Sequence, residues 1–300
     1  MQQKTCIIIA GPTAVGKTSL AITLAQHFNT AIISADSRQC FRELDIGVAK
    51  PSPAQLQEVK HYFINTHAIT DDVNAGLFEQ YALAAATAIF ETHDVAVMVG
   101  GTGLYIKAFC EGMDDMPPVA SEVRNTILKK YEEGGMAWLQ KEIQAADPEY
   151  YAGGEIHNPQ RLMRALEIKL STGKSIRSFQ QGKKVERPFN IIKVGLDLPR
   201  EDLYRNINQR VDDMMQQGLE QEVRSLLPFR GLNALQTVGY SELFDCFDGK
   251  LSINEAIDTI KKNTRHYAKR QLTWFRKDDA IKWYSPLDSS QIKFYTDKLV

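Results

Sequence analysis

The residues best suited to chemistry lie near the start of the chain, where Gly11, Gly16, Lys17 and Thr18 match the pattern G-x-x-x-x-G-K-[ST]. The pattern follows an isoleucine-rich apolar run and precedes a stretch of helical periodicity, which is the context that a phosphate-binding P-loop requires. Glycines let backbone N–H groups close around phosphate oxygens, and the start of the next helix favours negative charge. Lys17 would neutralise the outer phosphate, and the Thr18 hydroxyl suits Mg²⁺. We therefore predict a phosphate site made by Gly11, Pro12, Thr13, Ala14, Val15, Gly16, Lys17 and Thr18; the alternative is a glycine turn without a ligand.

The identity of the phosphate compound is less constrained by these residues. A P-loop ATPase or GTPase usually carries an aspartate at the end of a buried strand to organise Mg²⁺. The apolar run at 94–101 leads instead into Gly100-Gly101-Thr102-Gly103, and the chain has no Asn-Lys-x-Asp guanine signature. The acid occurs at Asp36, after a different run. A small-molecule or nucleoside kinase and a non-catalytic RNA-binding protein or nucleotide switch therefore stay open as alternatives.

A parallel sheet is the element that would bring these groups together. Apolar runs alternate with helical stretches at 17–28 and 75–92, and this order implies parallel strands with right-handed crossovers. Active groups should then lie just beyond the carboxyl ends of the strands. The strands are predicted at 5–10, 31–36, 94–101 and 191–198.

A helical insertion interrupts this α/β pattern. From Asp114 to Arg187 the sequence shows helices without a convincing strand, opened by Met116-Pro117-Pro118 and closed by a polar stretch at 180–188. We therefore expect a core of residues 1–113 and 188–300, and a helical insertion domain at 114–187.

Composition limits the class of protein. Of the 300 residues, 43% are hydrophobic and 24% charged, which is ordinary for a globular protein with a core, and the net charge of -1 requires any nucleic-acid binding to use local patches. The four cysteines are far apart and form no CxxC pair, which argues against a zinc site or disulfide framework and fits a reduced compartment. The first apolar run, Cys6 to Ala10, is too short for a signal peptide, and no segment is long enough to span a membrane. We predict a cytoplasmic protein without a membrane partner.

Several motifs, found in family order over most of the chain, resemble those of the tRNA dimethylallyltransferase (tRNA isopentenyltransferase) family. The matching segments are GPTAVGKTSLA at 11–21, ISADSRQCFRELDIGVAKP at 33–51, VGGTGLYIKA at 99–108, NPQRLMRALEI at 158–168, TVGYSEL at 237–243 and NTRHYAKRQLTWFRK at 263–277. Three places depart from the family pattern: Cys40-Phe41 for Val-Tyr, Val48 for Thr, and Asn65 for Asp. The chain ends soon after WFRK and is similar to the bacterial type.

The resemblance implies a fold, a reaction and partners. The fold would be a P-loop NTPase-like α/β fold, with a parallel sheet flanked by helices and a helical insertion that contacts tRNA. The enzyme would be a prenyltransferase that moves the dimethylallyl group of dimethylallyl diphosphate to N6 of the adenosine immediately 3′ of the anticodon. Its substrates would be tRNAs reading codons that begin with U, bound through the anticodon stem-loop. Mg²⁺ on Thr18 would be the cofactor, and we expect a monomer.

The same resemblance assigns roles around the P-loop. Asp36 would be the general base that takes the proton of the adenine amine, because that amine is a poor nucleophile. Its alternative role is a helix cap or an outer Mg²⁺ partner. Thr102 would orient the flipped adenine or the diphosphate, with simple turn chemistry as the alternative. Ser37, Arg38 and Gln39, with Asp36, would contact the target nucleotide; Arg38 as a solvated charge is the alternative.

Two basic stretches are candidates for the RNA surface. Residues 261–277 carry seven positive charges and no acid, and their interleaved aromatics, Tyr267, Trp274 and Phe275, would either stack on bases or pack in the core. Arg124 in the insertion is a further candidate. The second stretch is Gln160, Arg161, Leu162, Met163 and Arg164, whose two arginines are spaced to share a helical face.

Overall fold

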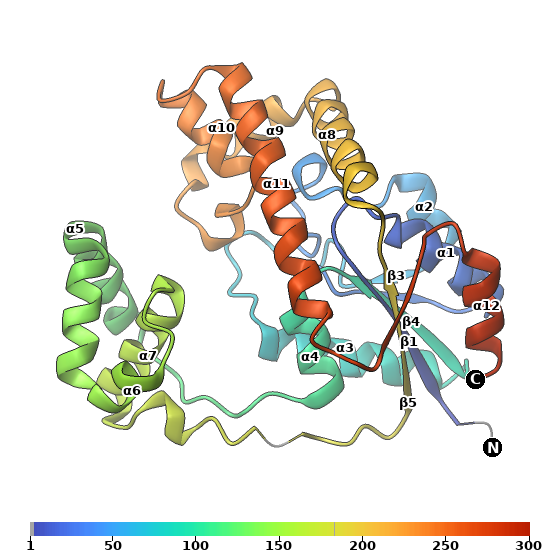
Figure 1. The fold of residues 1–300 in the computed structure, drawn as a ribbon, viewed down its shortest axis with the longest axis horizontal. Helices are drawn as coiled ribbons and strands as arrows, with labels where there is room; N and C mark the ends of the chain where they lie inside the picture. Colours follow the sequence, from blue (N-terminus) through green and yellow to red (C-terminus); the bar gives the residue numbers. More distant parts are fainter. Residues whose placement is uncertain (1–2, 183) are drawn as a thin grey trace. The chain divides into compact units, whose positions relative to one another are not determined.

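The computed structural model describes residues 3–182 and 184–300, which divide into two units (Figure 1). One unit comprises the described chain up to Glu111 together with Glu186–Val300, and the other is Gly112–Val185. The second unit covers nearly the same residues as the insertion expected at 114–187.

The first unit is built on a six-stranded parallel sheet with the strand order β3-β2-β4-β1-β5-β6. Thr5 of the central strand pairs with Val95 on one side and Asn190 on the other. The four predicted strands are present, whereas the two edge strands were not predicted. The strands are β1 (Thr5–Ala10), β2 (Ile32–Ser34), β3 (His61–Tyr62), β4 (Val95–Gly100), β5 (Asn190–Leu196) and β6 (Ile281–Tyr284).

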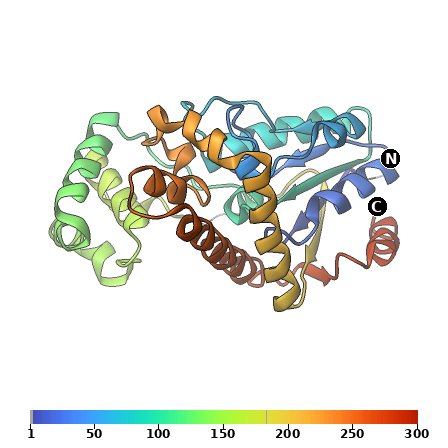
Figure 2. The same ribbon diagram turned by 90° about the horizontal axis from the view of Figure 1, so that it is seen from above.

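Helices cover both faces of this sheet, as the view from above shows (Figure 2). Successive side chains of β1 point to opposite faces: Cys6 and Ile8 enter one core, and Ile7 and Ile9 the other. The first core packs α3 (Ala75–Phe90), α4 (Gly103–Glu111), α9 (Leu219–Ser225) and α10 (Tyr240–Phe247); the second packs α1 (Lys17–His27), α8 (Arg200–Gln217) and α12 (Ser289–Asp297). The short α2 is Pro53–Glu58, and the 3-10 turns are η1 (Ile46–Val48), η3 (Leu227–Phe229) and η4 (Asn233–Leu235).

The long helix α11 (Ile253–Phe275) supplies residues to both cores and carries the basic stretch. A capping box fixes its start: the Glu255 N–H donates to Ser252 Oγ at 3.3 Å, and the Ser252 N–H donates to the Glu255 carboxylate at 2.7 Å. Such a box satisfies helix N–H groups that have no intrahelical partner, and it therefore sets where the helix begins.

The second unit is helical, with α5 (Ser121–Ala146), α6 (Pro148–Gly153), α7 (Pro159–Thr172) and the 3-10 turn η2 (Ile176–Ser178). Helix α5 is interrupted at Gly135, whose φ of 60° and ψ of −157° are not helical. Helix α7 begins where Asn158 accepts the Arg161 N–H and Pro159 occupies the first turn, and it ends at Gly173 in a left-handed conformation. Buried side chains of α5 and α7, among them Leu139 and Leu162, form a core of this unit's own. No helix in residues 3–182 and 184–300 has the length and hydropathy to cross a membrane.

Candidate active site

The P-loop connects β1 to α1 and has the backbone conformation that its glycines were predicted to allow. Gly11 has a φ of 147°, and a Cβ on it would lie 2.7 Å from the Leu196 carbonyl oxygen, so only glycine fits there. Gly16 is left-handed at the start of α1, and Ala14 also has a positive φ. Left-handed residues among right-handed ones aim consecutive N–H groups at one point, which makes a concavity for an anion.

A cavity of about 380 Å³ lies over this loop. Residues 13–19 line it, together with Asp36, Lys50, Arg210 and Asp213. We call it the P-loop cavity. Three cationic side chains thus face a space beside a helix N-terminus, which is an arrangement suited to a polyphosphate. Gly11 and Pro12 are buried and do not line the cavity, and the Pro12 carbonyl accepts a 2.7 Å hydrogen bond from Lys17 Nζ.

Lys17 is poised to respond to an anion. Burial of its ammonium, and to a smaller extent the charge of the neighbouring Arg210, lower its pKa to about 7, although Asp36 opposes both effects. Arg210, from α8, also has a lowered pKa because it is buried, and its Nη1 lies 3.5 Å from Thr13 Oγ1. The sequence analysis did not identify Arg210 as a site residue. Nothing in the sequence of α8 indicates that this helix contacts a loop nearly two hundred residues earlier in the chain.

Asp36 follows β2 and carries its carboxylate on a tight turn. Its Oδ1 accepts the N–H of Arg38 at 2.9 Å and of Gln39 at 3.3 Å, whereas Oδ2 accepts no hydrogen bond from any described residue. Thr102, after β4, accepts the Ser37 N–H at 3.1 Å. One oxygen of Asp36 therefore builds the turn, and the other is available to a ligand.

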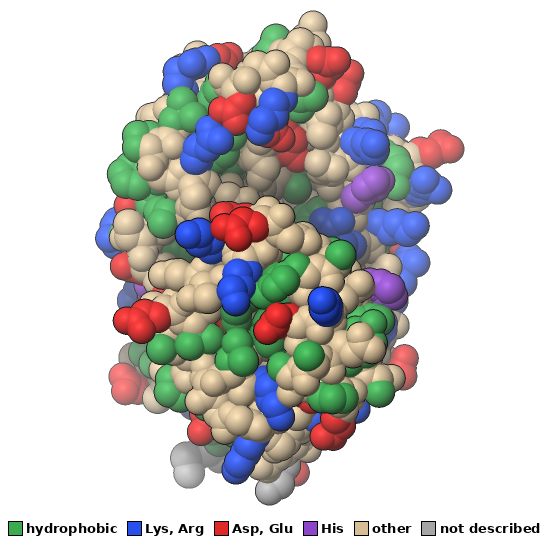
Figure 3. Space-filling view, turned by 90° about the vertical axis from the view of Figure 1, so that its left-hand side faces the viewer, with side chains coloured by type: hydrophobic (Ala, Val, Ile, Leu, Met, Phe, Trp, Pro, Cys, Tyr) green, Lys and Arg blue, Asp and Glu red, His purple; other side chains and the backbone are tan. Residues whose placement is uncertain are grey.

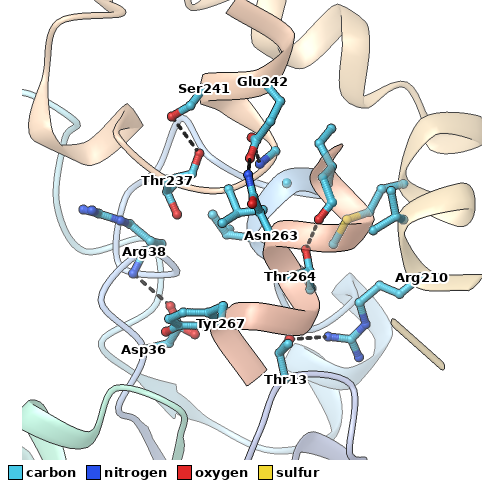
Figure 4. A pocket seen from close by; sticks show the side chains of 18 of the residues that line it. Thr13, Asp36, Arg38, Arg210, Thr237, Ser241, Glu242, Asn263, Thr264 and Tyr267 are labelled. Carbon is cyan, nitrogen blue, oxygen red and sulfur yellow. Dashed lines mark hydrogen bonds between the residues drawn. The ribbon is translucent and has the colours of Figure 1, made fainter. Parts of the chain in front are cut away.

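A second cavity, of about 540 Å³, opens on the other side of Asp36 (Figure 4). Its walls are Ser37 and Arg38, the turn Gly47–Ala49, and residues from α8, α10 and α11. We call it the α11 cavity. The two cavities share Thr13, Asp36, Val48, Ala49, Arg210 and Met214. Asp36 is thus the carboxylate at the place where the P-loop cavity and the larger α11 cavity meet.

Tyr267 of α11 lies beside Asp36 in the second cavity (Figure 4). Although 36% of this residue is exposed, its hydroxyl end is enclosed, and this desolvation, followed by the charge of Asp36, raises its pKa to about 12. The phenol therefore stays protonated at neutral pH, where it can donate a hydrogen bond but cannot act as a base.

Comparison with known proteins agrees with this geometry. The model of the "IPP transferase" family matches residues 39–278. The chain belongs to the IPP transferase family. It is 54% identical over 278 residues to the tRNA dimethylallyltransferase of Christiangramia forsetii, covering 93% of this chain and 92% of that protein. This confirms the family expected from the motifs.

Solved structures place the fold in the same family. The full-length tRNA isopentenylpyrophosphate transferase of Bacillus halodurans is 33% identical, with a TM-score of 0.73 over 99% of this chain and 97% of that one. A eukaryotic dimethylallyltransferase captured acting on tRNA is 26% identical, with a TM-score of 0.72 over 91% of this chain and 70% of that one. The P-loop NTPase-like fold is confirmed by these matches.

One IPP transferase motif holds a residue whose role only the structure revealed. Gln271, in NTRHYAKRQLTWFRK, is buried between the P-loop and the turn after β4. Its Oε1 accepts the Thr13 N–H at 2.8 Å, and its Nε2 donates to the Gly101 carbonyl at 3.0 Å. Helix α11 is thereby joined to both loops that flank Asp36. A glutamine within this basic stretch is a feature that the sequence shows. The sequence alone could not reveal that its partners are Thr13 and Gly101.

The basic stretch of this IPP transferase is partly neutralised within the chain. Lys261 pairs with Asp212 and Arg276 with Asp197, each at 2.6 Å, and Arg265 donates to Asn208. Phe275 is buried, as expected for core packing, whereas Tyr267 and Trp274 remain exposed by 36% and 39%. The exposed basic residues left on this helix and its end are Lys262, Lys269, Arg270 and Lys277.

In the helical unit, the five residues of α7 that were predicted to bind tRNA differ in their exposure to solvent. Leu162 and Met163 are buried in the core of the unit, so their side chains hold α7 in place, whereas Gln160 and Arg161 are exposed. Arg164 and Arg124 both face the buried carboxylate of Glu167, at 3.1 and 3.6 Å. Contact of this segment with tRNA stays a prediction, and it rests mainly on Gln160 and Arg161.

Proposed function

We propose that this protein transfers the dimethylallyl group of dimethylallyl diphosphate to N6 of the adenosine immediately 3′ of the anticodon, giving N6-isopentenyladenosine and diphosphate. The substrates would be tRNAs that read codons beginning with U. The observation that carries the proposal is the position of Asp36, where the P-loop cavity and the α11 cavity meet. The family and the names of its relatives support the same reaction.

The reaction is a displacement at C1 of the donor. The adenine N6 attacks C1 from the α11 cavity, the C1–O bond breaks, and diphosphate leaves on the P-loop side. The adenine lone pair is delocalised into the ring, so N6 must lose a proton as the C–N bond forms. The free Oδ2 of Asp36 takes that proton, because Oδ1 is already engaged by the Arg38 and Gln39 N–H groups.

Negative charge develops on the leaving diphosphate, and cations are already in place to stabilise it. Lys17 and Arg210 face the P-loop cavity, and Gln271 holds the Thr13 end of the loop fixed. Because these groups need no rearrangement as charge develops, they stabilise the transition state more than water would. No phosphoryl group moves, and a phosphate-binding loop here serves a leaving group.

Mg²⁺ fits this cavity as a partner of the diphosphate. Thr18 and the Asp213 carboxylate both line the cavity and supply the oxygen ligands that Mg²⁺ prefers. In the described part of the chain, no group of three or more His, Cys, Asp or Glu side chains could hold a metal by itself. A bound Mg²⁺ would therefore share its ligands with the diphosphate, whose charge it would help to neutralise.

The labelled donor provides the direct test. Incubation of the protein with isotopically labelled dimethylallyl diphosphate, Mg²⁺ and an unmodified anticodon stem-loop should transfer label to the RNA and release diphosphate. A matched stem-loop with guanosine in place of the target adenosine should accept none. ATP turnover without RNA, and no labelled product, would instead support the kinase alternative.

Other features of the proposal follow from the substrate and the cavities. The enzyme would act on tRNA in the cytoplasm. It would act as a monomer, because residues of one chain line both cavities. Lys and Arg are interspersed with Asp and Glu on the face shown in Figure 3, so tRNA binding would depend on local groups such as those of α11.

Binding of diphosphate should take up a proton above neutral pH. In the free protein Lys17 has a pKa of about 7, and a bound anion would raise it toward its ordinary value. At pH 8 Lys17 is mostly neutral before binding and charged after it, so calorimetry with inorganic diphosphate in buffers of different ionisation enthalpy should show uptake of roughly one proton. At pH 6 the same experiment should show little uptake by Lys17. Equal uptake at both pH values would contradict the assignment.

The two exposed-face arginines of α7 should behave differently on substitution. Arg161 has no ion pair among the described residues, so Arg161→Ala should weaken tRNA binding and reduce the salt slope by about one unit. Arg164→Ala instead removes a partner of the buried Glu167 and should mainly lower the melting temperature. Affinity for tRNA measured against salt, alongside thermal unfolding, separates the two effects. A lower melting point with unchanged tRNA affinity for Arg161→Ala would refute its role in RNA binding.

A further inference from the structure

We propose that the turn Asp45–Ala49 and Met214 form a wall that limits the prenyl donor to five carbons, and that Glu222 is the positioning residue that holds this wall in place. The inference rests on the proposed function, because it concerns the donor of that reaction. Its elements are the three apolar residues common to both cavities, Val48, Ala49 and Met214, and the contacts behind them.

The position of the prenyl chain follows from the two ends of the reaction. The diphosphate occupies the P-loop cavity and the amine attacks beside Asp36, so C1 lies between them. The remaining carbons must contact the surfaces that both cavities share. Of the six shared residues, Thr13, Asp36 and Arg210 are polar, which leaves Val48, Ala49 and Met214 to contact a hydrocarbon.

The turn that carries Val48 is fixed by a carboxylate from another helix. Glu222 of α9 accepts the backbone N–H groups of Asp45, Ile46 and Gly47, at 3.2, 2.7 and 3.1 Å. It also accepts the hydroxyl of Tyr240 at 2.5 Å. Glu222 lines neither cavity, so these four hydrogen bonds serve the shape of the turn and make no contact with a substrate.

The turn has no room to retreat from a longer chain. A Cβ on Gly47 would lie 2.6 Å from the Tyr240 ring, so the backbone is already in close contact with that ring. On the other side, Gln39 Nε2 donates to the Val48 carbonyl at 3.3 Å and to the Ala49 carbonyl at 3.0 Å. Val48 is therefore held from both sides, and a longer donor cannot displace it without breaking several hydrogen bonds.

Met214 closes the wall from α8, and the next residue offers a natural comparison. Met214 and Met215 are both partly buried and both pack against the same core, but only Met214 lines the cavities. A ten-carbon donor would have to displace Met214 or extend into the α11 cavity, where the adenine must bind. The wall therefore selects against longer donors by shape. In an apolar pocket, one extra methylene group lowers the preference for a substrate by roughly 10–200-fold.

The test measures donor selectivity by calorimetry with dimethylallyl diphosphate, geranyl diphosphate and inorganic diphosphate. The guanosine stem-loop is present, so that the α11 cavity is filled and no prenyl group is transferred. The unmodified protein should bind the five-carbon donor more tightly than the ten-carbon one. Met214→Ala should shift the ratio of the two affinities at least about tenfold toward geranyl diphosphate, whereas Met215→Ala should leave it unchanged. Val48→Ala should shift the ratio in the same direction, and Val238→Ala, which changes only the α11 cavity, should not.

The positioning role of Glu222 has its own control on the same helix. Glu222→Gln should also relax the ratio, whereas Glu220→Gln, which removes only a pair with Arg224, should not. Unchanged affinity for inorganic diphosphate in every variant would show that the P-loop is intact. A lowered melting point for Glu222→Gln with an unchanged ratio would overturn the positioning role.

Two results would overturn the wall itself: equal affinity of the unmodified protein for both prenyl donors, or the same shift from Met215→Ala as from Met214→Ala. Failure of the proposed function would look different. In that case no label would reach the RNA, although the ratio of the two donor affinities still changed in Met214→Ala and Val48→Ala and not in their controls.

Discussion

Asp36→Asn is expected to lower the rate of prenyl transfer by about 10²–10⁴-fold while tRNA and donor binding stay close to those of the unmodified protein. Asparagine keeps the Oδ1 atom that accepts the Arg38 and Gln39 N–H groups, so the turn after β2 should persist. What it loses is the second carboxylate oxygen and with it the ability to take the N6 proton. Single-turnover rates with saturating substrates measure this step directly.

Substitution of a second carboxylate, Asp213, distinguishes the loss of a general base from the loss of a negative charge near the donor. Asp213 lines the P-loop cavity but not the α11 cavity, so Asp213→Asn lowers the negative charge near the donor without touching the adenine side. Its effect should fall on donor or Mg²⁺ affinity and leave the single-turnover rate at saturation much less changed than Asp36→Asn does. A rate like that of the unmodified protein in Asp36→Asn would assign the proton transfer to another group, and Asp36 would then be a capping residue.

Lys17→Met or Arg210→Met is expected to lower kcat/KM for the donor by about 10²–10³-fold, because each removes a cation preorganised for the leaving diphosphate. Affinity for tRNA should be spared. Arg205→Met is the control for α8: Arg205 is paired with Asp202 and lies outside the P-loop cavity, so this change should leave donor kinetics nearly unchanged. Equal losses in Arg205→Met and Arg210→Met would indicate damage to the helix and not to the site.

The pH dependence provides an independent check on Arg210. Its charge is one of the causes that lower the pKa of Lys17. Arg210→Met should therefore raise the pKa of Lys17 above 7 and move the loss of diphosphate affinity, which occurs as Lys17 deprotonates, to higher pH. Diphosphate affinity measured from pH 6 to pH 9 would reveal the shift. An unchanged profile would show that Lys17 does not titrate in this range.

Local features of the chain were accessible from the sequence. The P-loop is a single segment in which a strand, a turn and a helix follow one another, so the spacing from Gly11 to Thr18 already specifies its geometry. The central strands are buried on both faces and therefore appear as continuous apolar runs. The edge strands β3 and β6 escaped notice because they are short and only partly buried, which leaves no such run. The helical unit was recognisable because its proline-marked start interrupts the α/β pattern.

What the tertiary structure decided is how distant residues meet. Arg210 and Gln271 lie 197 and 258 residues after Thr13 of the P-loop, and the parallel sheet brings both to the loop at its carboxyl edge. In the helical unit, adjacency in sequence could not distinguish the buried Leu162 from the exposed Arg161, because the face of a helix that is buried depends on what packs against it. The sequence by itself determined the family and the position of the P-loop, since contiguous motifs specify both. The two cavities, and Asp36 between them, exist only because folding closes long loops and places separate helices around one strand end.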